Sequence, residues 1–304
     1  MRGGFHISTS LFYNLSSNKT TNITIGFIMG KPCPIFRFDT RGKKWEQWIL
    51  LTADRHHDSK HSNLKMQKRH HKLARERNAI IFDFGDMYDA MQGKKDFRGT
   101  KSDLKDELNR TDYFNALIES GVEFWQKDKD LLKFICYGNH ETAIIKHNEV
   151  DILSLMVDKL NAQGAEIQLA GYQGWIRLNF QGGDTGRQSL KIWYTHGSGG
   201  SAPVTKGTIK TNRRNAMIDG ADLIISGHIH QDWRVGTPKK RLNDNGIEYI
   251  ADVQHIQLPS YKQVTDAPYG FETEKEFAPT LPGAVWLRFH VQDRKVKYDI
   301  IKAD

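Results

Sequence analysis

Five short apolar runs, each followed at once by polar residues, constrain the fold of this 304-residue chain more than any other feature. The runs are rich in Ile, Phe, Tyr and Trp. Runs of this length and composition are typical of buried strands. The predicted strands occupy residues 48–53, 79–84, 131–136, 190–195 and 221–226.

Helical patterns lie between these strands. Apolar residues recur at i, i+3, i+4 spacing in 112–126 and again in 149–162, where Gly164 follows as a stop signal. Residues 64–77 are basic and weakly amphipathic, which predicts a largely solvated helix. His61, His70 and His71 are predicted to be surface histidines. Strands that alternate with helices indicate an α/β architecture.

The second half of the chain is richer in strand patterns. Residues 175–180 alternate, a glycine-rich break follows, and 190–195 returns as in a hairpin. Further strands are predicted at 247–253, 285–291 and 295–301. We find no internal repeat and no convincing linker, so residues 31–304 are predicted to form a single domain. Residues 1–30, dominated by Ser, Thr and Asn, are predicted to be a poorly ordered extension.

Composition and charge indicate which partners and which cellular compartment to expect. The formal net charge of +8 favours polyanionic partners such as nucleic acid, although many basic proteins are merely soluble. The two cysteines, Cys33 and Cys136, provide no disulfide framework, which fits a reducing cytoplasm. No run is long enough to span a membrane. The oligomeric state is not predicted.

Potential metal ligands follow all five strands. In open α/β sheets the carboxyl edge is where ligands bind, and residues i and i+2 of an extended segment point the same way. This nitrogen and oxygen donor set suits Mn, Fe, Zn or Ni, and a shared carboxylate could divide it between two metals. Taken singly, each residue could be a turn residue, but the coincidence favours a shared site. The set is Asp54, His56, Asp86, Asn139, His196, His228 and His230.

The order of these motifs resembles the calcineurin-like metallophosphoesterase superfamily. The motifs are Asp-x-His, Gly-Asp-x-x-Asp, Gly-Asn-His-Glu, a single His and Gly-His-x-His, and they span residues 52–230. Residues 93–96 and the segment 196–207 further resemble the subgroup common in phages and mobile elements.

The resemblance implies a four-layer α/β/β/α sandwich with two divalent metal ions, manganese first among the candidates. A metal-bridging hydroxide would be the nucleophile. His140 would face the leaving-group oxygen as general acid or charge stabiliser, and Asp89 would orient its imidazole. Metal one would take Asp54, His56, Asp86 and His230, and metal two Asp86, Asn139, His196 and His228.

Other residues are weaker candidates. The glycine loop 197–200 could approach a phosphate, and Gly199, Lys206, Arg213 and Arg214 are candidate substrate-binding residues. A solvated basic face is an equal alternative. His57 and Asp58 could support His56 or could be ordinary loop residues.

These features predict a dinuclear metal-dependent phosphodiesterase or nuclease, whose substrate would be a nucleic acid or a nucleotide. A phosphomonoesterase resembling protein phosphatases is the enzymatic alternative. The arginines that such phosphatases use to clamp a monoester are absent, because Ala90 or Met91 and Tyr137 stand at those positions. The third alternative is a non-catalytic nucleic-acid-binding protein on the same core.

Overall fold

The computed structural model describes residues 24–26, 33–42, 44–91, 103–200, 205, 207–263 and 280–303. Within these ranges the chain forms two β-sheets and five α-helices, and two short 3-10 helices lie at Asp106–Leu108 and Gly183–Thr185. The α-helices are α1 (Leu64–Glu76), α2 (Tyr113–Trp125), α3 (Asn139–Asn148), α4 (Ile152–Asn161) and α5 (Thr208–Met217).

The first sheet has the strand order β13-β12-β3-β4-β5-β6. Its β3, β4, β5 and β6 run parallel, so their carboxyl ends meet at one edge, and β12 adds antiparallel to β3. The strands are β3 (Glu46–Thr52), β4 (Ile80–Asp83), β5 (Leu132–Cys136), β6 (Gln168–Ala170), β12 (Ala284–Gln292) and β13 (Lys295–Ala303).

The second sheet has the order β1-β2-β7-β8-β9-β11-β10. Its β8 and β9 run parallel, whereas β7 and β8 form the predicted hairpin and β10 pairs antiparallel with β11. The strands are β1 (Thr24–Gly26), β2 (Ile35–Asp39), β7 (Gln173–Gln181), β8 (Arg187–Thr195), β9 (Leu223–Ser226), β10 (Trp233–Leu242) and β11 (Glu248–Gln257).

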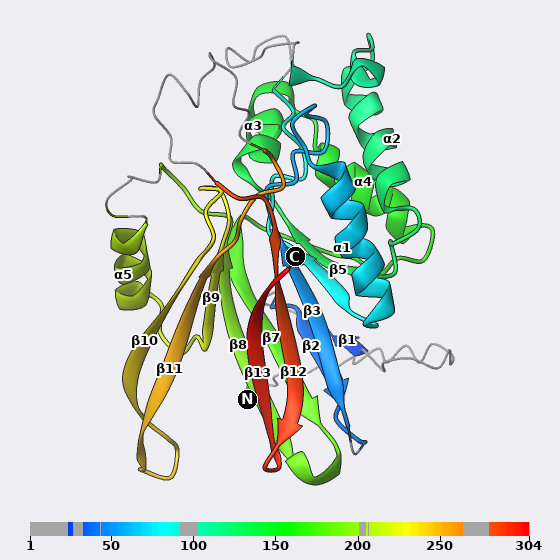
Figure 1. The fold of residues 1–304 in the computed structure, drawn as a ribbon. Helices are drawn as coiled ribbons and strands as arrows, with labels where there is room; N and C mark the ends of the chain where they lie inside the picture. Colours follow the sequence, from blue (N-terminus) through cyan, green and yellow to red (C-terminus); the bar gives the residue numbers. More distant parts are fainter. Residues whose placement is uncertain are drawn as a thin grey trace, which may run out of the picture.

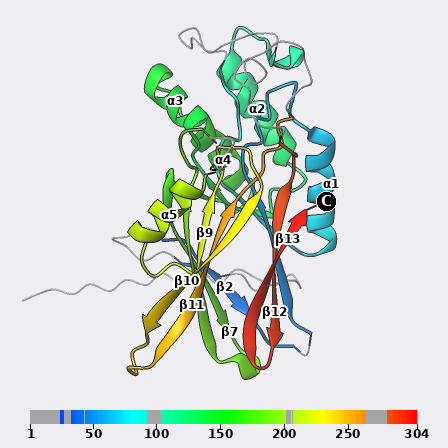
Figure 2. The same ribbon diagram turned by 60° about the vertical axis from the view of Figure 1, so that its left-hand side comes forward.

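The sheets pack face to face and helices cover their outer faces (Figures 1 and 2). Buried aromatic residues join the sheets, with ring centroids 4.7 Å apart for Phe36 and Phe82 and 5.9 Å for Phe84 and Tyr194. A second core lies between the first sheet and α1, α2 and α4. A smaller cluster on the second sheet includes Trp193 and Ile224 and contacts Ile218 after α5. The mixed α/β fold predicted from the sequence is confirmed.

Helix α1 differs from the prediction. His70 and His71, predicted to be surface histidines, are buried, while His61 is partly exposed. His70 Nδ1 lies 2.8 Å from the hydroxyl of Tyr261, and His71 Nδ1 lies 2.9 Å from a carboxylate oxygen of Asp128. A pattern of apolar residues could not show this buried face, because its polar side chains are satisfied by distant partners.

Most of the predicted extension, residues 1–23 and 27–30, lies outside the described residues. Thr24–Gly26 form β1, which pairs with β2. The single domain over 31–304 stays a prediction. None of the described helices is long and apolar enough to cross a membrane.

Candidate metal centre

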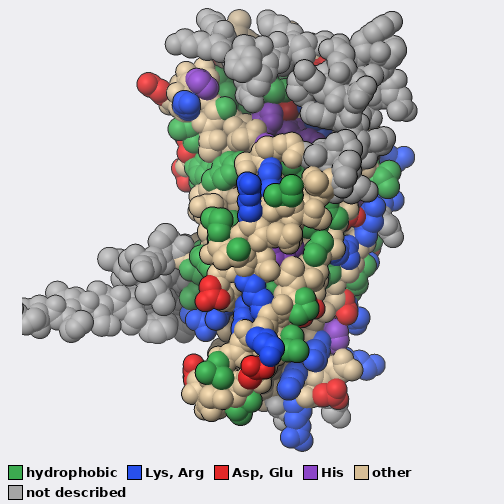
Figure 3. Space-filling view, turned by 90° about the vertical axis from the view of Figure 1, so that its left-hand side faces the viewer, with side chains coloured by type: hydrophobic (Ala, Val, Ile, Leu, Met, Phe, Trp, Pro, Cys, Tyr) green, Lys and Arg blue, Asp and Glu red, His purple; other side chains and the backbone are tan. Residues whose placement is uncertain are grey.

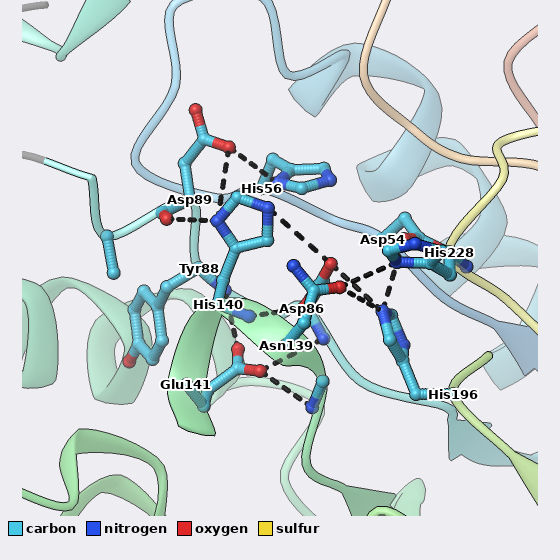
Figure 4. A network of polar contacts seen from close by, with 12 residues as sticks. Asp54, His56, Asp86, Tyr88, Asp89, Asn139, His140, Glu141, His196 and His228 are labelled. Carbon is cyan, nitrogen blue, oxygen red and sulfur yellow. Dashed lines mark hydrogen bonds and ion pairs between the residues drawn. The ribbon is translucent and has the colours of Figure 1, made fainter. Parts of the chain in front are cut away.

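The predicted ligands from both sheets lie together (Figure 4). Asp54, Asp86 and Asn139 follow β3, β4 and β5 of the first sheet. His56 also follows β3, whereas His196 follows β8 and His228 and His230 follow β9 of the second sheet. The five predicted strands thus do not share one sheet, yet the carboxyl ends of both parallel sets face the same site.

One group of donor atoms comes from Asp54, His56 and His230, whose atoms lie within 4.8 Å of one another. The Nε2 atoms of His56 and His230 are 3.2 Å apart, and His230 Nε2 is 3.3 Å from Asp54 Oδ1. That buried oxygen accepts no hydrogen bond from the described residues. Two imidazole nitrogens that meet beside an unsatisfied carboxylate oxygen fit a shared cation.

A second group comes from Asp86, His196 and His228, with the amide of Asn139. His196 Nε2 lies 3.0 Å from Asp86 Oδ2 and 3.1 Å from Asn139 Oδ1. His228 Nδ1 lies 2.6 Å from the same amide oxygen. His196 Nε2 is also 3.8 Å from Asp54 Oδ1, so the two groups adjoin each other. The structure therefore brings together all seven predicted ligands.

The charges of the site also fit a cation. Asp54 and Asp86 are buried, and neither forms an ion pair with a Lys or Arg in the described part of the chain. Burial alone would raise the pKa of Asp86, but the charge of His196 holds it well below its usual value. Burial would lower the pKa of His196, and Asp86 and Asp54 instead raise it to about 10. Without a metal, a protonated His196 offsets only one of the two carboxylate charges, and a divalent cation in its place would balance both.

The backbone at the ligands is strained. Asp54, His56, Asp86, His228 and His230 have positive φ angles of 52°, 46°, 55°, 76° and 55°. Such a conformation costs about 1–3 kcal/mol for a residue other than glycine, and it persists where the surrounding structure fixes it. The Asp54 N–H donates to the Gly85 carbonyl at 2.8 Å, and the His228 N–H donates to Asp54 Oδ2 at 2.9 Å. The loops that carry the ligands therefore hold one another in place.

Glu141 is a buried support for this geometry. Its carboxylate accepts hydrogen bonds from the N–H groups of Asp86, Tyr88 and Gly138 at 3.2, 3.0 and 2.8 Å. It thereby joins the loop after β4 to the start of α3, and Figure 4 shows it beneath the ligands. Burial and the neighbouring Asp86 raise the pKa of Glu141 to about 7.

His140 lies beside the ligands and contacts Asp89, the residue predicted to orient it. Its Nδ1 is 2.5 Å from the backbone carbonyl of Asp89, whereas the Asp89 carboxylate is 3.9 Å away. That carboxylate instead lies 2.8 Å from His56 Nδ1 and 3.2 Å from the ammonium group of Lys262. Asp89 therefore orients His140 through its backbone and His56 through its side chain. A carboxylate behind a metal-binding histidine fixes the ring and increases its basicity.

Arg55 is a buried supporting residue that the sequence did not predict. It stands between Asp54 and His56, but its side chain is fully buried and lies 2.5 Å from Asp83. Its guanidinium carbon lies 4.6 Å from the centroid of the Trp125 ring. The only signal in the sequence was a charged residue directly after an apolar run.

Asp58 supports the loop that follows β4. Its carboxylate accepts hydrogen bonds from the N–H groups of Asp89 and Ala90 at 2.6 and 2.9 Å. His57 Nε2 lies 2.8 Å from the Ser120 hydroxyl, away from the ligands.

Of the candidate substrate-binding residues, Gly199, Arg213 and Arg214 are described, and Lys206 lies outside the described residues. Residues 93–96, on which the subgroup resemblance partly rests, also lie outside the described residues. Near Gly199, the Tyr172 hydroxyl donates to the Gly197 carbonyl at 2.5 Å, and its ring centroid is 5.5 Å from that of His196.

Comparison with known proteins gives only distant structural likenesses. No protein-family profile and no curated protein sequence matches the chain. The chain is similar to GAP50, the anchor in the inner membrane complex of Plasmodium, with 12% identity, a TM-score of 0.42 and coverage of 85% of this chain and 89% of that one. It is also similar to Vacuolar Protein Sorting 29 from Cryptosporidium parvum, with 12% identity, a TM-score of 0.33 and coverage of 86% and 100%. These likenesses contribute nothing to the functional argument below.

Proposed function

We propose that this protein is a hydrolase of phosphodiesters that uses two divalent cations. The observation that carries the proposal is the pair of adjoining donor groups, one at Asp54, His56 and His230 and one at Asp86, His196 and His228. Two bound cations would lower the pKa of a water molecule and neutralise phosphate oxygens. The resemblance gives Asp86 the position between the cations, and its Oδ2 lies 3.0 Å from His196 Nε2. Asp54 Oδ1 also lies near both groups, 3.3 Å from His230 Nε2 and 3.8 Å from His196 Nε2.

His140 would supply the proton for the leaving group. Its Nδ1 carries the hydrogen that is donated to the Asp89 carbonyl, so Nε2 is free to face the substrate. Nε2 lies 3.7 Å from Asp86 Oδ2, at the edge of the donor set. Burial lowers the pKa of His140, but Asp86 and Asp89 outweigh this and raise it above its usual value. When the ring is protonated, it can donate from Nε2 to a leaving oxygen.

The surroundings favour diesters over monoesters. Tyr137 stands where a monoester clamp would place an arginine, and its hydroxyl donates to Asp151 at 2.6 Å. Ala90 or Met91 stands at the other clamp position; Ala90 is buried and Met91 is partly buried. A dianionic monoester benefits most from bidentate arginine contacts, and none of these side chains can provide them.

The test is hydrolysis of bis-p-nitrophenyl phosphate with Mn, Fe, Zn or Ni, compared with the monoester p-nitrophenyl phosphate. We expect faster turnover of the diester and its loss in Asp86→Ala. Asp130→Ala, which removes an exposed aspartate after α2, is the matched control and should keep the wild-type rate. Full activity of Asp86→Ala would refute the proposed mechanism.

A further inference from the structure

Helix α5 carries three cations on one side. Lys210, Arg213 and Arg214 follow i, i+3, i+4 spacing and are called the α5 cluster below. In the described part of the chain, none of the three forms an ion pair with a carboxylate. The segment 201–206 before the helix contains Lys206 and no acidic residue.

The α5 cluster lies beside the candidate metal centre. Arg214 donates from Nη1 to the Ser226 hydroxyl at 2.7 Å, and Ser226 ends β9 two residues before His228. A Cβ added to Gly199, in the loop after His196, would lie 2.7 Å from Lys210 Nζ. Figure 3 shows Lys and Arg side chains on this face of the molecule, below a group of histidines.

Two side chains in or near α5 have buried nitrogens without hydrogen-bond partners among the described residues. The ammonium nitrogen of Lys210 is covered from solvent and has no hydrogen-bond partner among the described residues. His255, buried in the neighbouring β11, likewise has no partner there for either ring nitrogen. Burial lowers the pKa of Lys210, and the charges of Arg214 and Arg213 lower it further. An anion bound at the cluster would provide a partner for the Lys210 ammonium group.

We propose that the α5 cluster binds a phosphate of a nucleic-acid strand next to the phosphate being cleaved. This inference rests on the proposed function and specifies its substrate class. A substrate with a single phosphate would place it at the metals and leave the cluster empty, whereas a strand carries further phosphates on both sides. Lys and Arg contacts to the backbone of a strand need no particular base sequence.

The binding test uses full-length protein and a fluorescein-labelled single-stranded DNA of about 20 nucleotides, in EDTA so that the strand stays intact. Lys210→Gln/Arg213→Gln removes two charges and spares Arg214, which also holds Ser226. Loss of the contacts to this one phosphate should reduce the slope of log K against log salt by about 0.7 and weaken binding about tenfold. Arg69→Gln/Lys127→Gln, at exposed positions on the side of α1 and α2, is the matched control and should bind like wild type. Equal slopes and affinities for both double variants would overturn the proposal.

Cleavage rates on two substrates distinguish a failure of this inference from a failure of the proposed hydrolase activity. Lys210→Gln/Arg213→Gln should lower the cleavage rate of the labelled strand. This loss should be at least about tenfold larger than its loss of rate on bis-p-nitrophenyl phosphate, which has no second phosphate. Equal losses on both substrates would overturn the inference. If wild type hydrolyses neither substrate with any metal while the double variant still loses strand binding, the proposed hydrolase fails and the α5 cluster stands as a nucleic-acid-binding site. Thermal melts of both double variants check that the fold is intact.

Discussion

Arg55 is predicted to hold the first ligand loop to the helical layer, and its removal should be severely destabilising. Arg55 and Asp83 are both fully buried, with Arg55 Nε 2.5 Å from Asp83 Oδ2. Arg55 also donates to Gln67 at 2.9 Å and to the Thr52 hydroxyl at 3.0 Å. Removing one partner of a buried pair leaves an uncompensated charge, which costs about 3–5 kcal/mol. Arg55→Met should therefore lose about 3–5 kcal/mol of unfolding free energy near neutral pH.

The assay is a double-mutant cycle of Arg55→Met, Asp83→Asn and the double variant, followed by urea unfolding. The double variant removes both charges, so it should be more stable than the sum of the single losses predicts, by about 2 kcal/mol or more. The control cycle uses the exposed pair Arg110 and Asp112, for which a coupling below about 1 kcal/mol is expected. Losses at Arg55 and Asp83 that add within about 0.5 kcal/mol would refute the reasoning.

Three further predictions concern the loops and the core. Gly138→Ala would place a Cβ 2.0 Å from Asp86 Oδ1, so manganese binding by calorimetry should be lost, and wild-type affinity would contradict the geometry. Glu141→Gln should weaken metal affinity about 10–100-fold in the same titration, and an unchanged affinity would count against its support of the ligand loops. Burial lowers the pKa of His255 to about 4, so stability present above pH 6.5 should be lost as pH falls towards 4, by up to about 3 kcal/mol. Urea unfolding at both pH values should show that His255→Met removes much of this loss; an unchanged pH dependence would exclude His255 as its source.

The sequence predicted the strands and the ligand set because both have local signals. A buried strand is an apolar run, and a ligand at its end is a polar residue at a fixed offset. The division of the five strands between two sheets had no such signal, because strand pairing depends on contacts between distant residues. Helix α3 was also missed, since it begins within the motif at Asn139 and its first turn is polar.

Supporting contacts were the least predictable part of the site. The buried face of α1 is polar, and His71 is satisfied by Asp128, 57 positions away in the sequence. Asp89 was expected to orient His140, and its backbone carbonyl contacts that ring. Its carboxylate also lies beside His56 and Lys262, which the sequence did not indicate. A sequence shows which groups are available, whereas these partners depend on the folded arrangement of the loops.

The most direct test of the central claim is the number of metal ions bound by each chain. Native mass spectrometry of the full-length protein after reconstitution with manganese should show two ions per chain for wild type and fewer for Asp86→Ala. Asp130→Ala should retain two. A wild-type chain that binds no manganese, or one ion only with each of Mn, Fe, Zn and Ni, would contradict the dinuclear centre proposed for Asp54, Asp86 and their histidine partners.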